Sequence, residues 1–392
     1  MKNNQYIEFY TEVRDTIAQR SCPVMNAHRE EALRIFSEHG FPSKKVERYK
    51  YTDVAQDFAP DYGIQLSPIA TERTEFCRSV KEADIDLAPY YNNIADNGDA
   101  VVALNTMLAV DALLIHVPRN TRAKHPIQIN NVLKGKQDTM TNRRVLIVAE
   151  EHAEVKLLFC DHAADDQQFL TTQVMEVYAG PDSSIEIYGL EETHQRNTLV
   201  ANTYIRQADR SQVRHNLITL HNGKTRQTTH LTLAGEGAEC WANGAVIADK
   251  DQHVDNNTLI DHKAPNCTSN EMYKYVLDGK ATGAFAGRIL VREGAQKTAS
   301  KETNANLCAT RTARMYTQPM LEIYADDVKC SHGATIGRLN EEEQFYMRSR
   351  GITLEDARVL QMISFIAPVL ENIPEDEREA VAAKFEEAVR SI

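Results

Sequence analysis

The sequence predicts a mainly β protein in which a solenoid of stacked β coils lies between two helical regions. Strand starts recur at intervals of 27 to 30 residues through the middle of the chain, which is typical of a solenoid. The segments on either side carry apolar residues at the spacing of amphipathic helices. With 392 residues, the chain can bury a sizeable core and hold more than one structural region.

The first predicted region, residues 1–98, is mainly helical. Apolar residues have helical spacing over 6–19 and again over 28–39, where Gly40 follows as a C-cap. The next stretch, FPSKKVERYKYTDV at 41–54, combines aromatic and basic residues. It is either a basic binding patch or a packed connector, and the acidity of the whole chain favours the connector.

The second predicted region, residues 99–338, is the β core. It begins at Ala100 with the short β runs VVALNTM, ALLIHVP and PIQINNVL. A triplet that follows a turn and opens a strand then recurs, as Ala153-Glu154-Val155, Ser183-Ser184-Ile185, Ser211-Gln212-Val213, Ala238-Glu239-Cys240 and, more weakly, Pro265-Asn266-Cys267. A second set of strands starts half a period later. Two strands per coil fit a solenoid better than a four-stranded propeller blade, but an antiparallel sandwich stays open because patterning does not show strand direction.

The two ends of a solenoid leave unpaired backbone N–H and C=O groups. The helical segments at the two ends of the chain are suited to covering them. A coil left uncovered would pair with another subunit by strand addition. We therefore expect an obligate partner at the end that carries residues 319–336.

The segment 321–332 brings a cysteine and a histidine close together. Leu321, Ile323 and Ala325 alternate with polar residues, as in a half-buried strand, and the alternation shifts across residues 326–327. If a strand continues, Cys330 and His332 project from one face. Thiolate and imidazole suit iron, zinc and copper, but two ligands do not complete a site. A strand cysteine is more often a small core residue, so any metal site needs ligands from a partner or another strand.

The third predicted region, residues 339–392, is helical. Asn340 starts one helix, which ends at Arg350-Gly351, and Thr353 starts a second helix. The apolar surface of the second helix is too broad for a lone exposed helix. It either packs on a third helix after Pro374 or docks a partner, and the periodicity favours neither.

Composition excludes several classes of protein. A net charge of −12 and a pI of about 5.6 argue against nucleic acid or an anionic membrane as a partner. No apolar run approaches the roughly 20 residues that span a bilayer, so we expect a cytoplasmic protein. The seven scattered cysteines disfavour a disulfide framework or a zinc ribbon. There is no P-loop sequence, so we expect that the chain binds no nucleotide.

Four segments together carry a family resemblance: FPSKKVERYKYTD at 41–53, DQHVDNNTLIDHKAP at 251–265, YKYVLDGKATGAFAGRILVREGAQKT at 273–298 and LEIYADDVKCSHGATIGRLNEEEQFYMRSRGI at 321–352. They resemble the SufB/SufD family of the SufBCD iron-sulfur cluster assembly complex. The run Val328-Lys-Cys-Ser-His332 is similar to the SufD branch, because the SufB branch has a Glu-containing run there. One departure is Cys308, which stands where the family has an aliphatic run and so occupies a core position.

The resemblance implies a right-handed parallel β-helix that pairs with a SufB-type paralogue through the ends of the two β-helices. It assigns that contact to Val328, Lys329 and Ser331. It implies that His332, with Cys330 beside it, helps to build a transient iron-sulfur cluster shared with SufB.

The same resemblance implies a second contact, in which a SufC-type ATPase docks on the C-terminal helices. The residues assigned to this contact are Phe345, Tyr346, Arg350 and Gly351. Homodimers of the isolated chain are a further expectation. On this interpretation the chain is a scaffold and not an enzyme.

Two alternatives remain from the residues. In the first, the chain is a purely structural adaptor and SufB alone holds the cluster, so His332 is dispensable. In the second, the chain is a β-helix carbohydrate-active enzyme whose carboxylates come from residues 249–255 and Asp261-His262. Solvated turn residues are the simpler interpretation of that acidic run.

Overall fold

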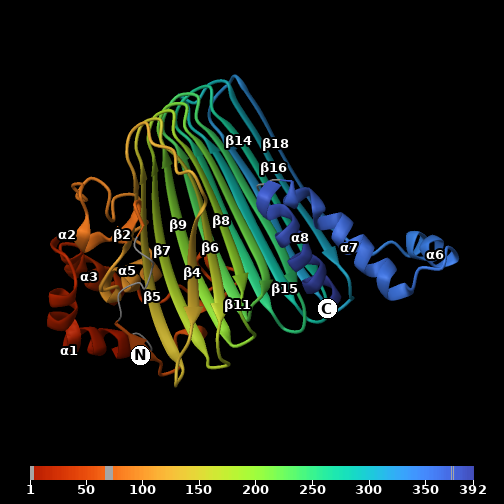
Figure 1. The fold of residues 1–392 in the computed structure, drawn as a ribbon, viewed down its shortest axis with the longest axis horizontal. Coiled ribbons are helices and arrows are strands. Elements are labelled where there is room, and N and C mark those ends of the chain that lie inside the picture. The colour runs from red at the N-terminus through yellow and green to blue at the C-terminus, as the bar shows by residue number, and fades with distance from the viewer. Residues whose placement is uncertain (1–3, 67–73, 372, 374) are drawn as a thin grey trace.

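The computed structural model describes residues 4–66, 74–371, 373 and 375–392, and shows a parallel β-solenoid with helices at both ends of the chain (Figure 1). Each coil gives one strand to each of two sheets. Sheet A contains β1 (Gly63–Gln65), β2 (Cys77–Ser79), β3 (Leu113–Val117), β5 (Thr139–Ala149), β7 (Phe169–Ala179), β9 (Asn197–Gln207), β11 (Lys224–Leu233), β13 (His253–His262), β15 (Thr282–Val291) and β17 (Arg314–Ile323). Sheet B contains β4 (Ile127–Leu133), β6 (Glu154–Ala163), β8 (Ser184–Glu192), β10 (Gln212–His221), β12 (Glu239–Ala248), β14 (Thr268–Leu277), β16 (Thr298–Cys308) and β18 (Val328–Gly337).

The predicted repeat corresponds to the pairing of successive strands in sheet B, where the third residue of one triplet pairs with the third residue of the next. Val155 pairs with Ile185, Ile185 with Val213, and Val213 with Cys240, all in parallel. Parallel pairing of successive coils rules out the antiparallel sandwich and confirms the β-helix. The weak fifth triplet was misplaced, because Ser269 rather than Cys267 pairs with Cys240.

The chain begins with helices, as predicted, although the short strands β1 and β2 also lie within residues 1–98 and α5 begins after them. The N-terminal helices are α1 (Asn4–Arg20), α2 (Pro23–Asn26), α3 (Arg29–His39), η1 (Glu47–Tyr49), α4 (Val54–Asp57), η2 (Val80–Glu82) and α5 (Ala100–Leu108). Gly40 ends α3 with φ 60° and donates its N–H to Phe36 O. The β run predicted at 101–107 is wrong, because Asp99 caps α5 by accepting from the N–H groups of Val101 and Val102.

The N-terminal helices pack on the outer face of sheet A at its first coils (Figure 1), where they share one apolar cluster with Met140, Leu170 and Val200. The 41–54 stretch is a packed connector rather than a basic patch. Arg48 forms ion pairs with Asp96 and Asp99, at 2.5 and 2.8 Å. Carboxylates of the N-terminal region therefore hold Arg48. The connector is attached to the solenoid by the Thr52 hydroxyl, which donates to Asp255 of β13, and by the Arg48 carbonyl oxygen, which accepts from Arg226 of β11.

The C-terminal region contains α6 (Glu341–Ser349), α7 (Leu354–Leu370) and α8 (Glu375–Arg390). The predicted N-caps are present: Asn340 accepts from the N–H groups of Glu342 and Glu343, and Thr353 accepts from that of Asp356. Pro374 itself lies outside the described residues. No helix in the described ranges is long and apolar enough to cross a bilayer.

The apolar surface of α7 is buried, so packing rather than partner docking explains most of it. Met362 and Ile366 of α7 and Phe385 of α8 are buried in one cluster with outward side chains of sheet B. Figure 1 shows α7 and α8 lying along the face of the solenoid. The C-terminal helices therefore cover a face and not the last coil, contrary to the capping that we expected.

The interior of the coils is apolar at first and becomes polar toward the C-terminal end. Inward residues of β6 belong to the main apolar cluster, whereas His215 of β10 is an inward polar residue and inward positions of β16 include Ser300, Glu302 and Asn304. Cys308 is buried beside Leu277 and Phe285, so it occupies a core position as expected.

Glu191 in β8 gives the stability a predictable pH dependence. Its buried carboxylate accepts hydrogen bonds from the hydroxyls of Thr225 and Thr219, and burial nevertheless raises its pKa from 4.5 to about 8. The native state therefore keeps this proton to higher pH than the unfolded chain. Its contribution to stability is fully present below pH 4.5 and is lost as pH rises to about 8, by about 1.4 kcal/mol per pH unit.

Replacing Glu191 with glutamine (Glu191→Gln) is expected to make the unfolding free energy depend less on pH between these two values, because glutamine does not titrate. Urea denaturation of both proteins at several pH values across this range measures the difference. Identical slopes of unfolding free energy against pH in the two proteins would contradict the assignment.

Candidate functional site

Within the described part of the chain, the last coil of the solenoid has two strand edges that pair with no other strand. Strand β17 is the final strand of sheet A and β18 is the final strand of sheet B, so each pairs with a neighbour on one side only. We call this pair of strands the open end. Large apolar side chains are exposed here, among them Ile323, Tyr324 and Ile336. Unpaired strand edges with exposed apolar residues are a template for strand addition by another chain.

The chain crosses from one sheet to the other within the segment that we predicted as a single shifted strand. Strand β17 ends at Ile323 and β18 begins at Val328, with a turn between them. Ala325 in this turn is buried in a small apolar cluster with Ile289 and Val291. The shift across residues 326–327 is therefore a corner of the coil.

Cys330 and His332 lie on the same, inward face of β18. Cys330 pairs with Ser300 and His332 with Glu302 in the parallel register. Cys330 is half-buried against the small apolar cluster, and this burial raises the pKa of its thiol above the usual value. His332 is exposed. The imidazole is therefore accessible to a partner, whereas the thiol is partly a core group.

The other residues assigned to the SufB contact divide between the two faces of β18. Val328 is half-buried and packs on the same small cluster as Cys330. Lys329 and Ser331 are exposed on the outward face. All three lie on the strand whose outer edge is unpaired.

Helix α6 and the two residues that follow it carry the exposed residues assigned to the ATPase contact, and in Figure 1 α6 projects away from the solenoid. Phe345 is 72% exposed and Tyr346 is 60% exposed. The Arg350 guanidinium lies over the Tyr346 ring, 5.3 Å from its centroid, and Gly351 has φ 90° at the end of the helix. A groove between α6 and α7 has Tyr346 and Leu360 in its lining. An apolar surface of this kind on a projecting helix is typical of a protein contact.

The acidic residues proposed for carbohydrate chemistry do not form a catalytic pair. Asp255 is buried and paired with Arg226 at 3.2 Å, and Asp261 is paired with Arg292 at 2.9 Å. Asp255 and Arg226 are both buried, and the buried Asp261 carboxylate is paired with a half-exposed Arg292, so neither aspartate is the solvated turn residue that we expected. Because their oxygens are already engaged, the structure gives no support to the carbohydrate-active enzyme.

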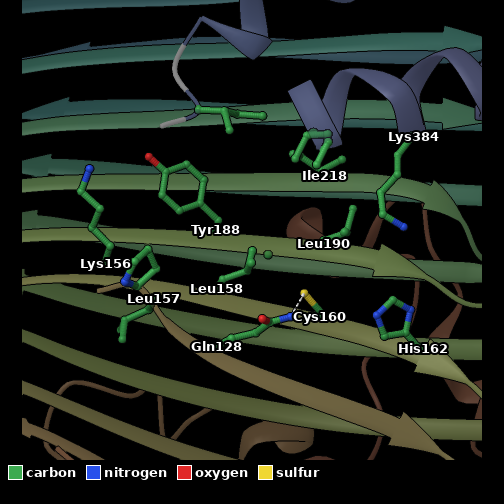
Figure 2. A pocket seen from close by; sticks show the side chains of 15 residues that line it. Gln128, Lys156, Leu157, Leu158, Cys160, His162, Tyr188, Leu190, Ile218 and Lys384 are labelled. Carbon is green, nitrogen blue, oxygen red and sulfur yellow. Dashed lines mark hydrogen bonds between the residues drawn. The ribbon is translucent and has the colours of Figure 1, made fainter. Parts of the chain in front are cut away.

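A cavity of about 200 Å³ lies between α8 and the outer face of sheet B (Figure 2). Its lining is mainly aliphatic, and Gln128 approaches Cys160 Sγ at 3.9 Å within it. Lys384 reaches into the lining from α8 and pairs with Glu192 at 2.5 Å. The cavity therefore marks incomplete packing of α8 rather than a cluster of reactive groups.

Two interior glutamates were missed in the sequence. Glu271 in β14 and Glu302 in β16 are neighbours in the register, and both are buried. The signal that points to them is the polar, alternating run Ser300, Glu302, Asn304 in β16, at positions that face the interior. Among the residues that the structure describes, no three His, Cys, Asp or Glu side chains are placed to hold a metal together.

Comparison with known proteins gives matches along the chain. Residues 131–365 match the family described as SUF system FeS cluster assembly, SufBD core domain, and residues 1–77 and 75–129 match the SufBD protein N-terminal region. The chain is 27% identical over 389 residues to the iron-sulfur cluster assembly protein SufD of Escherichia coli, covering 91% of this chain and 90% of that protein.

Two further relatives are covered less completely. A SufBD family iron-sulfur cluster assembly protein of Synechocystis is 31% identical over 304 residues, which is 74% of this chain and 66% of the relative, slightly less than two thirds of it. SufD of Bacillus subtilis is 26% identical over 276 residues, 70% of this chain and 63% of that protein. The core-domain match alone spans more than half of the chain, so the chain belongs to the SufBD family of the SUF iron-sulfur cluster assembly system.

Proposed function

We propose that the chain is a non-catalytic scaffold subunit on which nascent iron-sulfur clusters are assembled at the junction with a SufB-type paralogue. The observation that carries this proposal is the open end, where the exposed imidazole of His332 stands on a strand with an unpaired edge. Backbone groups of β18 pair with the partner by strand addition, and Lys329 and Ser331 contact it from the outward face. Iron and sulfide are the substrates of this junction.

Within the junction, His332 supplies an imidazole, which suits iron as a ligand. Cys330 lies beside it and becomes a ligand only when its thiol loses a proton, which its partial burial opposes. The remaining ligands come from the SufB-type partner, because this chain offers too few at this position.

Hydrolysis of ATP occurs in a SufC-type partner that docks on α6. Strand β18 ends at Gly337 and α6 begins at Glu341, so only a short link separates the docking helix from the strand that carries His332. A movement of α6 is therefore transmitted directly to the open end. ATP drives such a movement only if it binds the two states of the complex with different affinities.

The experiment that tests the scaffold role compares two purified preparations under anaerobic conditions. One contains the SufB-type, SufC-type and present chains co-expressed together, and the other lacks the present chain. Size-exclusion chromatography, iron analysis and acid-labile sulfide analysis are applied to both. We expect a stable three-component complex that accumulates cluster, and little cluster without the present chain. Equal cluster content in both preparations would overturn the proposal.

One observation favours a second candidate, the structural adaptor. Of the two proposed ligands, His332 is exposed, whereas Cys330 is half-buried against the small apolar cluster of the last coil. The adaptor has the same partners and fold, and differs in leaving His332 without a role.

A further inference from the structure

Among the residues that the structure describes, two carboxylates inside the last coils make no hydrogen bond of normal geometry. Glu271 is 0% exposed and Glu302 is 1% exposed. All four of their carboxylate oxygens lack a hydrogen bond to any described residue. Burying an unpaired, ionised carboxylate is costly, and native proteins usually pair such groups or coordinate them to a metal. An unsatisfied pair therefore requires an explanation beyond packing.

The surroundings of the pair contain oxygen rather than positive charge. Thr258 in β13 is close enough to Glu271 for its hydroxyl to oppose the rise in the pKa of that carboxyl, but the geometry between the two groups is not that of a hydrogen bond. Gly287 makes room for the second carboxylate, since a Cβ at that position would lie 2.0 Å from Glu302 Oε1. Burial raises the pKa of both carboxyl groups, and the neighbouring Glu271 raises that of Glu302 further. With no cation bound, the pair therefore tends to keep protons.

Glu302 and Glu271 lie in line with His332, at equivalent inward positions of successive strands behind the open end. His332 is the register partner of Glu302, and Glu302 is the register partner of Glu271. Parallel neighbours are about 4.8 Å apart, so each of these residues stands one coil behind the previous one. The Glu302 carboxylate is therefore the first interior acidic group behind the exposed imidazole.

We propose that Glu271 and Glu302 form an interior carboxylate site for a divalent cation, Fe²⁺ in the working complex, which enters from the open end beside His332. Carboxylate and hydroxyl oxygens suit divalent cations of this class, and two carboxylates with water complete such sites in other proteins. Binding releases the protons that the carboxyl groups hold. The choice of Fe²⁺ among divalent cations rests on the proposed function; the site itself rests on the interior geometry.

Mn²⁺ binding to the purified full-length chain, followed by electron paramagnetic resonance, tests the proposal. We expect saturable binding that weakens by about 100-fold or more in Glu271→Gln/Glu302→Gln. The matched control is Glu191→Gln, which replaces another buried interior glutamate whose carboxylate is already hydrogen-bonded by Thr225. This control is expected to bind Mn²⁺ like the wild type. Equal binding by the wild type and the double variant, or no saturable binding by either, would overturn the site.

Two further measurements keep this test separate from that of the proposed function. A thermal shift with Mn²⁺ should appear in the wild type and be absent in the folded double variant, whereas an equal shift in both would count against the site. His332→Ala is expected to retain Mn²⁺ binding by the isolated chain even if it loses cluster assembly in the complex. Loss of Mn²⁺ binding in His332→Ala would contradict a site made by the two glutamates. Normal cluster assembly by His332→Ala would contradict only the proposed function.

Discussion

A chain in which Phe345 and Tyr346 are both replaced by alanine is expected to lose its SufC-type partner and to keep its fold. Both aromatic side chains are mostly exposed on α6 and belong to none of the buried clusters, so their removal leaves no cavity. An aromatic side chain that becomes buried on binding contributes about 2 kcal/mol to the binding free energy. Loss of two such side chains therefore raises the Kd by roughly a thousandfold.

Affinity of the isolated chain for the SufC-type ATPase, measured by isothermal titration calorimetry, checks this expectation. Tyr324→Ala is a suitable control, because Tyr324 is similarly exposed but lies at the open end. The control should bind the ATPase normally. An unchanged affinity in Phe345→Ala/Tyr346→Ala would show that the ATPase docks elsewhere.

The second large effect concerns the buried ion pair that joins the N-terminal region to the solenoid. Glu176 in β7 pairs with Arg144 in β5 at 2.6 Å, and the two side chains are 0% and 1% exposed. The same carboxylate accepts the backbone N–H groups of Asn92, Ile94 and Ala95. Glu176→Ala leaves a buried guanidinium without its carboxylate and three backbone donors without an acceptor. We expect a loss of about 3–5 kcal/mol in unfolding free energy.

Urea denaturation followed by circular dichroism measures that loss. The control is Glu154→Ala, which removes the partner of Arg122 from an exposed ion pair and should cost no more than about 1 kcal/mol. Arg144→Met/Glu176→Leu should cost less than Glu176→Ala, because it leaves no unpaired charge in the core. A cost for Glu176→Ala as small as that of the control would contradict this role.

The features that the sequence predicted correctly depend on local or repeating signals. The coil repeat is visible because each coil pairs with the next in register, so equivalent strands begin at similar intervals. Helix caps at Asn340 and Thr353 are visible because capping depends on residues within one turn. The prediction that Cys330 and His332 project from one face of a strand follows from strand alternation alone, whereas the register shows that this face is the inward one.

The incorrect predictions concern residues whose structure is determined by tertiary contacts rather than by the local sequence. The nine residues of α5 are all buried, so they lack the polar face that distinguishes an amphipathic helix from a buried strand. Asp255 has its partner Arg226 on another strand, at a distance in sequence that no local pattern shows. Glu271 and Glu302 lie on adjacent strands of sheet B, one coil apart. Their proximity depends on the register between the two strands, which their spacing in the sequence does not give.

Cluster content of the reconstituted complex with His332→Ala tests the central claim most directly. The complex with the SufB-type and SufC-type chains is purified under anaerobic conditions, and iron and acid-labile sulfide are measured per complex. Thr335→Ala is the matched control, because Thr335 is exposed on the outward face of the same strand and is not among the residues assigned to the SufB-type contact. We predict that all three complexes remain intact, that the control matches the wild type, and that His332→Ala loses most of its iron and sulfide. Wild-type cluster content in an intact His332→Ala complex would contradict the account and establish the chain as a structural adaptor.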